Sequence, residues 1–261
     1  MTRPLLELAG ISKSYGGLKA LDAVSASMRA GEVVGLLGDN GAGKSTLLKV
    51  LSGALVPDSG EVRVAGRPVH FRSPRDAEAA GIEMVYQDLA LVPTLDAASN
   101  MFLGREPVRP GLLGRLGFLD KRRMRQESDR RIAELGASRV PPRREITLLS
   151  GGQQQAVAIA RATGGDEETI LLLDEPTAAL GVKQRERIMS LIRALRDKGT
   201  LVILITHDLP SCFDLADRLV VMRLGRIVAH VETSQTDMGE VVGWITGARD
   251  PLVTMPVKEA Q

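Results

Sequence analysis

The stretch Gly38-Asp39-Asn40-Gly41-Ala42-Gly43-Lys44-Ser45-Thr46 decides the fold of this chain. The apolar run before it, residues 33–37, predicts a short buried strand, and residues 47–51 after it predict the first turns of a helix. This context makes the pattern G-x-x-x-x-G-K-S/T a predicted phosphate-binding loop. Its glycines let successive N–H groups point into one concavity, and the helix N-terminus adds partial positive charge.

Two side chains of this loop have predicted roles toward a phosphate. Lys44 is expected to reach the β- and γ-phosphates, and the Ser45 hydroxyl is expected to ligate Mg²⁺. The alternative is a purely structural glycine turn. The strand and the helix on either side of the loop disfavour that alternative.

The composition indicates an ordinary globular chain. Its 261 residues, 44% hydrophobic and 25% charged, are enough for one large α/β domain or a domain with an inserted lobe. The net charge of +2 is too small to indicate nucleic acid, and Cys212, the only cysteine, fits a reducing compartment. The first residues lack a signal-peptide pattern and no apolar run approaches ~20 residues, so we expect any membrane role to come through a partner.

Two polar or aromatic residues at predicted strand ends are candidates for ligand contact. Tyr15 is either a half-buried strand aromatic or a stacking face for a nucleotide base, and the local pattern leaves both open. Residues 82–87 predict a strand, so Gln87 is expected at its end, where an open α/β sheet binds its ligand.

Residues 88–148 have helical patterns without β-branched strands and predict an inserted helical lobe. This region contains the basic run Lys121-Arg122-Arg123-Met124-Arg125. Contact with nucleic acid is one interpretation, but no aromatic residues interleave with the run. A solvated helix face is the favoured interpretation.

The stretch Leu149-Ser150-Gly151-Gly152-Gln153 opens an alanine-rich helix predicted from Gln154 to about Thr163. A serine and two glycines at a helix start offer N–H groups to an anion. A plain N-cap is the alternative interpretation of the same residues.

Two further strands are predicted to end in polar side chains. The run Ile170-Leu171-Leu172-Leu173 predicts a buried parallel strand that ends in Asp174 and Glu175, which are placed for Mg²⁺ and for orienting a water. The strand 200–205 is followed by His207, which alone would more often be a structural histidine. Near the C-terminus, a last helix is predicted with an apolar stripe of Met238, Val241, Val242 and Ile245.

Taken in order, these segments resemble the ATP-binding subunit of ATP-binding-cassette transporters, over nearly the whole chain. The resemblance implies an α/β fold, namely a P-loop NTPase core with a mostly parallel sheet, an N-terminal antiparallel β subdomain and an inserted helical lobe. It implies one domain over residues 1–247, with the core in 1–87 and 164–247, the lobe in about 88–163, and a flexible tail in 248–261.

The resemblance also implies the site residues, with ATP and Mg²⁺ as the ligands. The nucleotide-contacting set is Tyr15, Gly38, Asp39, Asn40, Gly41, Ala42, Gly43, Lys44, Ser45, Thr46 and the signature residues Ser150, Gly151, Gly152 and Gln153. The implied Mg²⁺ ligands are Ser45, Gln87 and Asp174, and the implied catalytic residues are Glu175, His207 and Gln87. The chain departs from the family at Gly181, where Ala-Leu-Asp is usual, which puts one contact between subunits in doubt.

A narrower resemblance concerns residues 38–46, 86–93 and 179–183, which look like bacterial simple-sugar importers of the ribose, xylose and fructose type, where Gly181 is ordinary. It implies a subunit that hydrolyses ATP to power the import of a monosaccharide. A single cassette implies a head-to-tail homodimer with ATP between the phosphate loop of one subunit and the signature of the other. The implied partners are transmembrane permease subunits and, indirectly, an extracytoplasmic sugar-binding protein, with the ATPase peripheral at the cytoplasmic face of the inner membrane and no nucleic acid involved.

Two other functions are weighed against this expectation. A cassette ATPase that acts on nucleic acid or ribosomes usually has tandem cassettes or long coiled insertions, and this sequence shows neither. A nucleotide-gated binding module that hydrolyses slowly is disfavoured by the intact Asp174-Glu175 pair and by His207.

Overall fold

The computed structural model describes residues 3–135, 140–164, 169–178 and 180–252. Its contacts divide the chain into two compact units. The first consists of Met1–Met84, Asp166–Glu175 and Arg196–Gln261, and the second of Val85–Gly165 and Pro176–Leu195. The predicted division into a core and a lobe at residues 87 and 164 stays a prediction, and residues 253–261 of the predicted tail lie outside the described residues.

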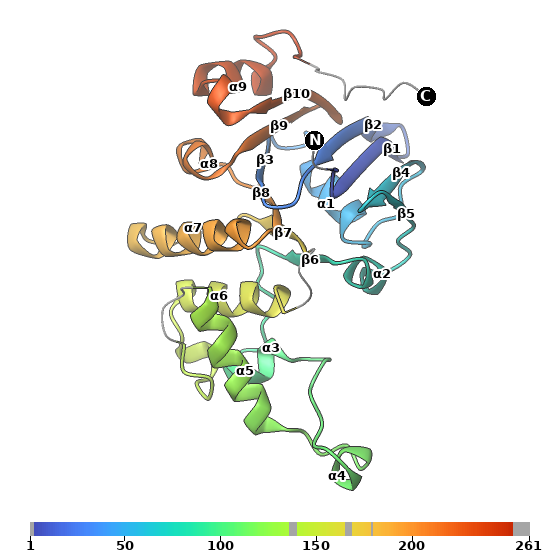
Figure 1. Cartoon of the computed structure of the whole chain (residues 1–261). Helices are drawn as coiled ribbons and strands as arrows, with labels where there is room; N and C mark the ends of the chain where they lie inside the picture. The colour runs from blue at the N-terminus through green and yellow to red at the C-terminus, as the bar shows by residue number, and fades with distance from the viewer. Residues whose placement is uncertain (1–2, 136–139, 165–168, 179, 253–261) are drawn as a thin grey trace. The chain divides into compact units, whose positions relative to one another are not determined.

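The smaller sheet of the first unit is antiparallel throughout, with the strand order β2-β1-β4-β5 (Figure 1). Its strands are β1 (Leu6–Tyr15), β2 (Leu18–Met28), β4 (Ser59–Val64) and β5 (Arg67–Val69). This sheet is the predicted N-terminal antiparallel β subdomain.

The larger sheet has the order β10-β9-β3-β8-β7-β6. The four strands from β9 to β7 pair in parallel, and β10 forms an antiparallel hairpin with β9. The strands are β3 (Val33–Gly38), β6 (Ile82–Val85), β7 (Ile170–Asp174), β8 (Leu201–Ile205), β9 (Arg218–Arg223) and β10 (Arg226–Glu232). Strands β3 and β8 are buried at every residue, as expected for parallel strands covered on both faces. The predicted α/β fold class is confirmed, although the strand expected over 82–87 ends at Val85.

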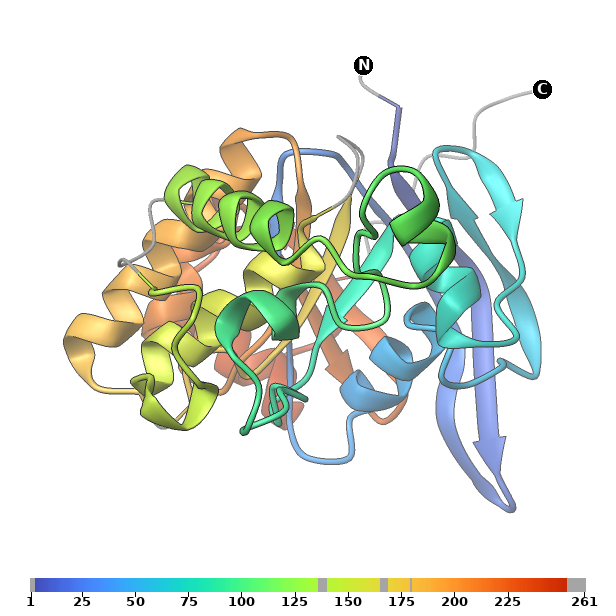
Figure 2. The ribbon, with the colours of Figure 1, turned by 90° about the horizontal axis from the view of Figure 1, so that it is seen from below.

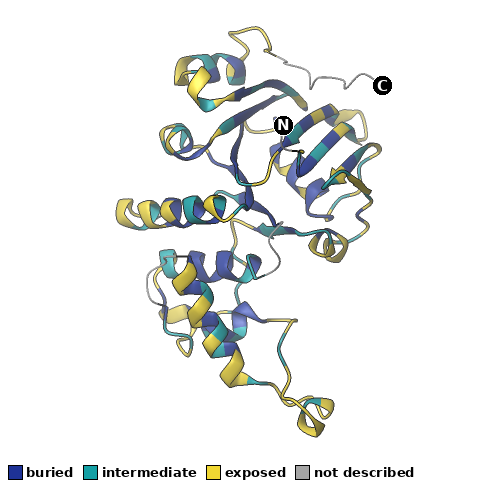
Figure 3. Ribbon diagram, viewed as in Figure 1, coloured by how far each residue is buried: buried dark blue, intermediate teal, exposed yellow. Residues whose placement is uncertain are grey.

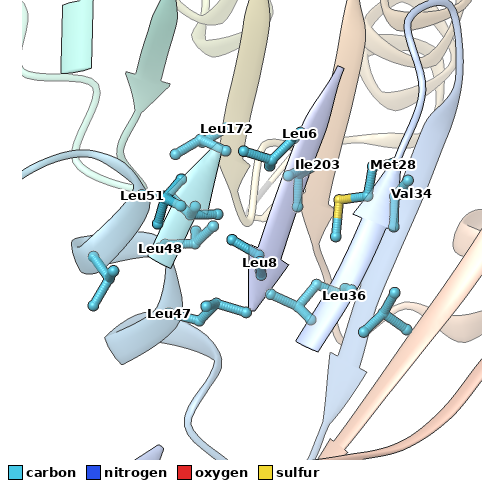
Figure 4. Packing of buried hydrophobic residues seen from close by; sticks show 14 of the residues in the cluster. Leu6, Leu8, Met28, Val34, Leu36, Leu47, Leu48, Leu51, Leu172 and Ile203 are labelled. Atoms are coloured by element: carbon cyan, nitrogen blue, oxygen red, sulfur yellow. The ribbon is translucent and has the colours of Figure 1, made fainter. Parts of the chain in front are cut away.

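One hydrophobic core joins the two sheets of the first unit through helix α1 (Lys44–Leu51). Residues 44, 47, 48 and 51 of this helix are buried on one face, and Val50 beside that face is buried too. Figures 1 and 2 show α1 beside the smaller sheet. The core side chains labelled in Figure 4 are Leu47, Leu48 and Leu51 from α1, Leu6, Leu8 and Met28 from the smaller sheet, and Val34, Leu36, Leu172 and Ile203 from the larger sheet.

The other helices of the first unit are α2 (Pro74–Ala79), α8 (Leu209–Leu215) and α9 (Met238–Thr246), with a 3-10 turn at Thr233–Gln235. The predicted apolar stripe of α9 is wrong in part. Val241 is buried, but Met238 and Val242 are exposed, and the buried partner of Val241 is Trp244. The helix therefore buries Val241 and Trp244, which are three residues apart. The Nε1 of the Trp244 indole donates a hydrogen bond to the Asp250 carbonyl at 3.1 Å.

The second unit is helical (Figure 1). Its elements are α3 (Ala97–Met101), α4 (Leu112–Arg115), α5 (Lys121–Glu134), a 3-10 turn at Ile146–Leu148, α6 (Gly151–Ala162) and most of α7 (Val182–Asp197). Helices α3, α5 and α6 pack against one another. Helix α6 begins at Gly151, three residues before the predicted start, because Ser150 caps it and leaves both glycines in the first turn.

Backbone hydrogen bonds join residues 93–97 to residues 144–147 within the second unit. The N–H of Ala97 donates to the Arg144 carbonyl at 3.0 Å, and the N–H of Ile146 donates to the Leu95 carbonyl at 3.1 Å. Asn100 is fully buried, and its amide bonds to the backbone of residues 92, 95 and 96. The segment that leads into the signature is therefore fixed to the segment that precedes α3.

The packing of α8 on strand β3 gives a stability prediction. A Cβ added at Gly35 would collide with the Cys212 Sγ and would lie 3.0 Å from Leu219 Cδ2. Because overpacking a core costs about 1–3 kcal/mol, Gly35→Ala should lower the free energy of unfolding by about that much in urea denaturation. Gly17→Ala, where no atom lies within 4 Å of the added Cβ, is the control. The double variant Gly35→Ala/Cys212→Ala should lose less stability than the two single losses added together, and strict additivity would contradict this packing.

Candidate functional site

The predicted phosphate loop connects the end of β3 to the start of α1. Gly38 has φ of 150°, and an added Cβ would collide with the Met222 carbonyl of β9. Gly43 has φ of 105°, and an added Cβ would lie 2.5 Å from the Ala20 carbonyl of β2. The loop is therefore held between two strands at distances that only glycine permits.

Lys44 is the first residue of α1 and is only 6% exposed. Its Nζ donates hydrogen bonds to the carbonyls of Gly38 at 2.8 Å and Asp39 at 3.0 Å. Burial lowers the pKa of Lys44, and the nearby carboxylates of Glu175, Asp39 and Asp174 oppose that shift. An ammonium group has three donors, so the third N–H of Lys44 can serve a ligand over the loop.

The register of the larger sheet aligns three strand ends. Leu36 of β3 pairs with Ile205 of β8, and Ile205 pairs with Asp174 of β7. Because parallel strands end at the same edge of a sheet, this register places Glu175 and His207 at the edge from which the loop begins. The structure thus brings together the loop, both predicted carboxylates and the predicted histidine.

Glu175 has an unusual backbone and an unpartnered side-chain oxygen. Its φ is 51°, which is uncommon for a residue with a side chain, and its N–H donates to the Ile205 carbonyl at 3.0 Å. The Oε1 atom is buried and lies 3.1 Å from Nε2 of His207, within ion-pair distance, but accepts no hydrogen bond from the described residues. Strain and an unsatisfied buried acceptor at one residue indicate a functional role.

Burial raises the pKa values of both Asp174 and Glu175. For Asp174 the charge of Lys44 opposes the shift, and for Glu175 the charge of His207 opposes it. Among the described residues, no cluster of three acidic, histidine or cysteine side chains could hold a metal by itself. The oxygen donors of Ser45 and Asp174 nevertheless suit Mg²⁺, which is commonly held by one or two protein oxygens together with phosphate oxygens.

Tyr15 and Gln87 were both predicted to lie at strand ends. The structure confirms this position for Tyr15 but not for Gln87. Tyr15 is the last residue of β1, pairs with Leu18 and is 50% exposed, so it is a strand-end aromatic with a free face. Gln87 is exposed and lies two residues beyond β6, in the second unit. The strand therefore ends earlier than expected, and Gln87 follows it in a loop.

The signature residues form a capped helix start in the second unit. The Gln153 N–H donates to the Ser150 Oγ at 3.4 Å, and the Ser150 N–H donates to the Gln153 Oε1 at 3.0 Å, which completes a capping box. Added Cβ atoms at Gly151 and Gly152 would lie 3.3 Å from side chains of Leu180 and Gln184, respectively. The signature glycines thus allow α6 to approach the start of α7.

Residues of β2, β9 and the β9–β10 turn contact the phosphate loop, and no sequence pattern predicted these contacts. Besides the Met222 and Ala20 carbonyls, the Gly225 N–H in the β9–β10 turn donates to the Ala42 carbonyl at 3.0 Å. Gly225 lies far along the chain from the loop, and its only local signal is that of a hairpin turn.

Known proteins are similar to this chain over most of its length. A family model described as "ABC transporter" matches residues 21–178. The fructose import ATP-binding protein FrcA of Rhizobium meliloti is 43% identical, over 95% of this chain and 96% of that protein. The xylose/arabinose import ATP-binding protein XylG of Sulfolobus acidocaldarius is 44% identical, over 93% of this chain and 94% of that protein.

A solved structure supports the same relationship. It is described as the dimeric structure of a post-hydrolysis state of the ATP-binding cassette MJ0796 bound to ADP and Pi. It is 27% identical with a TM-score of 0.70, and the match covers 87% of this chain and 98% of that one. With the family match over more than half of its residues, the chain belongs to the ABC transporter family.

Proposed function

We propose that this chain is the ATP-binding and ATP-hydrolysing subunit that powers a membrane importer for a monosaccharide. The names of the fructose and the xylose/arabinose relatives support the substrate class and do not favour a cassette acting on nucleic acid or ribosomes. The observation that carries the proposal is the buried Oε1 of Glu175 next to His207, at the sheet edge where the phosphate loop starts.

ATP binding follows from the loop geometry. The first N–H groups of α1 have no partners within the helix and point toward the phosphates, and the third N–H of Lys44 adds a charge-assisted hydrogen bond. The exposed face of Tyr15 would stack on the adenine. Ser45, Gln87 and Asp174 would hold Mg²⁺, which would neutralise phosphate charge when bound.

Hydrolysis needs an oriented water and a group that polarises it. The buried Oε1 of Glu175 is the proposed acceptor for the water proton, and burial raises the pKa of this carboxyl, which makes it a stronger base. His207 lies within 3.1 Å of Oε1 and is 59% exposed, so it is placed to hold the γ-phosphate beside the attacking water.

In the proposed dimer, the signature of one subunit would complete the site of the other. Ser150 and Gly151 are exposed at a helix N-terminus, a suitable anion site, and they would contact the ATP held by the loop of the partner. A related cassette is described as dimeric with ADP and Pi, which supports a head-to-tail homodimer.

The relatives that are import ATP-binding proteins support a wider assembly around this chain. No helix among the described residues is long and apolar enough to cross a bilayer. In the proposed importer, transmembrane permease subunits bind this ATPase at the cytoplasmic face of the inner membrane. An extracytoplasmic sugar-binding protein delivers the substrate to the permease.

Lys44→Ala tests the phosphate site. It removes the buried ammonium, so ATP affinity should fall by about tenfold or more, measured by isothermal titration. Lys49→Ala, an exposed lysine in the last turn of the same helix, is the control and should bind ATP with nearly unchanged affinity. Equal affinities for the two variants would mean that the phosphates bind elsewhere.

Glu175→Gln tests the role in hydrolysis. The amide keeps the shape but cannot act as the base, so steady-state ATPase activity should fall by at least ~10² while ATP binding is retained. An ATP-dependent dimer should accumulate in size-exclusion chromatography. Glu61→Gln, a change at a half-buried residue of β4 in the smaller sheet, should keep parental activity. A monomer-only elution with ATP would count against the shared site.

Gly151→Asp tests whether the signature of one subunit completes the site of the other. The added carboxylate would repel the partner's γ-phosphate, so turnover should be lost although each subunit still binds ATP. Mixed with Lys44→Ala subunits, Gly151→Asp subunits should regain part of the ATPase activity, because one interface of the mixed dimer carries neither change. The control mixture is Gly151→Asp with Lys44→Ala/Gly151→Asp, which has no intact interface. Full activity of Gly151→Asp alone would refute the shared site.

A further inference from the structure

The second unit carries a projecting segment, residues 107–120, which we call the α4 hairpin. An isolated antiparallel bridge joins Val108 to Leu119 at its base, where the Arg109 N–H donates to the Phe118 carbonyl at 2.9 Å. At its tip, Gly114 approaches the Arg109 carbonyl so closely that an added Cβ would collide with it. The hairpin is therefore a folded element with its own hydrogen bonds. Figure 1 shows it extending away from α3, α5 and α6.

The α4 hairpin exposes an apolar surface. None of the residues of α4 is buried, and Leu112 and Leu116 are 72% and 66% exposed. Figure 3 shows this end of the second unit as mostly exposed. The exposed apolar side chains of the hairpin are Val108, Leu112, Leu113, Leu116, Phe118 and Leu119. Several large apolar side chains gathered on one exposed element indicate an interaction site.

Basic residues surround this apolar surface. Residues 107–125 contain six arginines or lysines and one acidic residue, Asp120. The Asp120 carboxylate accepts the Arg123 N–H at 3.0 Å as the N-cap of α5. In the described part of the chain, Arg109, Arg115 and Lys121 are exposed and make no ion pair. Their charges are available to an anionic partner.

We propose that the α4 hairpin inserts its leucine tip into the headgroup region of an anionic lipid bilayer, with the flanking basic side chains on the lipid phosphates. Leu112, Leu113 and Leu116 are all exposed on the single turn at the tip. Val108, Phe118 and Leu119 are also exposed, on the segments before and after that turn. A protein groove covers one side of a helix, whereas the exposed apolar side chains of this hairpin continue from α4 onto both flanking segments, which a fluid interface can surround. The basic flanks match the negative surface of an anionic leaflet. Nucleic acid fits less well, because only Phe118 could stack on a base.

This contact goes beyond the proposed function, because it needs neither ATP nor a permease. It would give the ATPase an affinity for the membrane surface of its own. Binding through one short apolar tip and a basic flank is weak and reversible, as expected for a single anchoring element.

Vesicle flotation with the full chain, without nucleotide or permease, tests the proposal. The protein should bind vesicles of phosphatidylcholine with phosphatidylglycerol, bind less at high salt, and not bind phosphatidylcholine alone. Leu112→Ser/Leu116→Ser should reduce partitioning on the order of tenfold or more. The matched control is Leu18→Ser/Leu224→Ser, which changes two leucines of the first unit that are 69% and 76% exposed and should leave binding unchanged.

A site-directed label gives a second measurement. Cys212 is the only cysteine, it is fully buried, and burial raises its pKa to about 12, so a thiol-reactive dye should modify only an introduced cysteine. A polarity-sensitive dye on Leu113→Cys should shift to the blue with anionic vesicles, and the same dye on Leu18→Cys should not. Absence of vesicle binding, or binding that survives Leu112→Ser/Leu116→Ser, would overturn the proposal. Loss of permease binding by that variant, without any lipid binding by the parent, would also overturn it by assigning the tip to the permease.

Discussion

The candidate site depends on the close approach of the loop backbone to the strands on either side of it. Gly38 lies against the Met222 carbonyl of β9, and Gly43 lies against the Ala20 carbonyl of β2. These contacts tie both sheets of the first unit to one turn of chain. The ammonium of Lys44 then occupies the space beneath the turn, where it binds the Gly38 and Asp39 carbonyls. A side chain at either glycine would displace the loop and the lysine together.

The charges at this sheet edge are mutually dependent. Burial lowers the pKa of Lys44 and raises the pKa values of Asp174 and Glu175, and the attraction between the ammonium and the carboxylates opposes all three shifts. The first unit therefore holds a small set of desolvated charges before any ligand arrives. In the proposed ATP complex, a nucleotide with its cation would add both signs of charge at once and would preserve a balance that a lone anion would disturb.

Local sequence patterns were sufficient to predict the buried parallel strands of the larger sheet. The strand ends at Gly38, Asp174 and Ile205 agree with the apolar runs, because buried parallel strands are continuous in sequence. Contacts between distant residues could not be predicted in this way. The hydrogen bond from Gly225 to the loop has no local signal, and the left-handed backbone of Glu175 arises from its place at a strand end. The roles of the site residues remain predictions.

The hydrogen bonds between residues 93–97 and 144–147 make one rigid strap of two stretches that are distant in sequence. Asn100 holds the first of these stretches from within the core, because its buried amide bonds to the backbone of residues 92, 95 and 96. A force applied at the segment before α3 is therefore carried to Leu149 and the first turn of α6 without passing through a soft joint. In the second unit, the segment that leads into the signature can separate from the segment before α3 only if these backbone hydrogen bonds break.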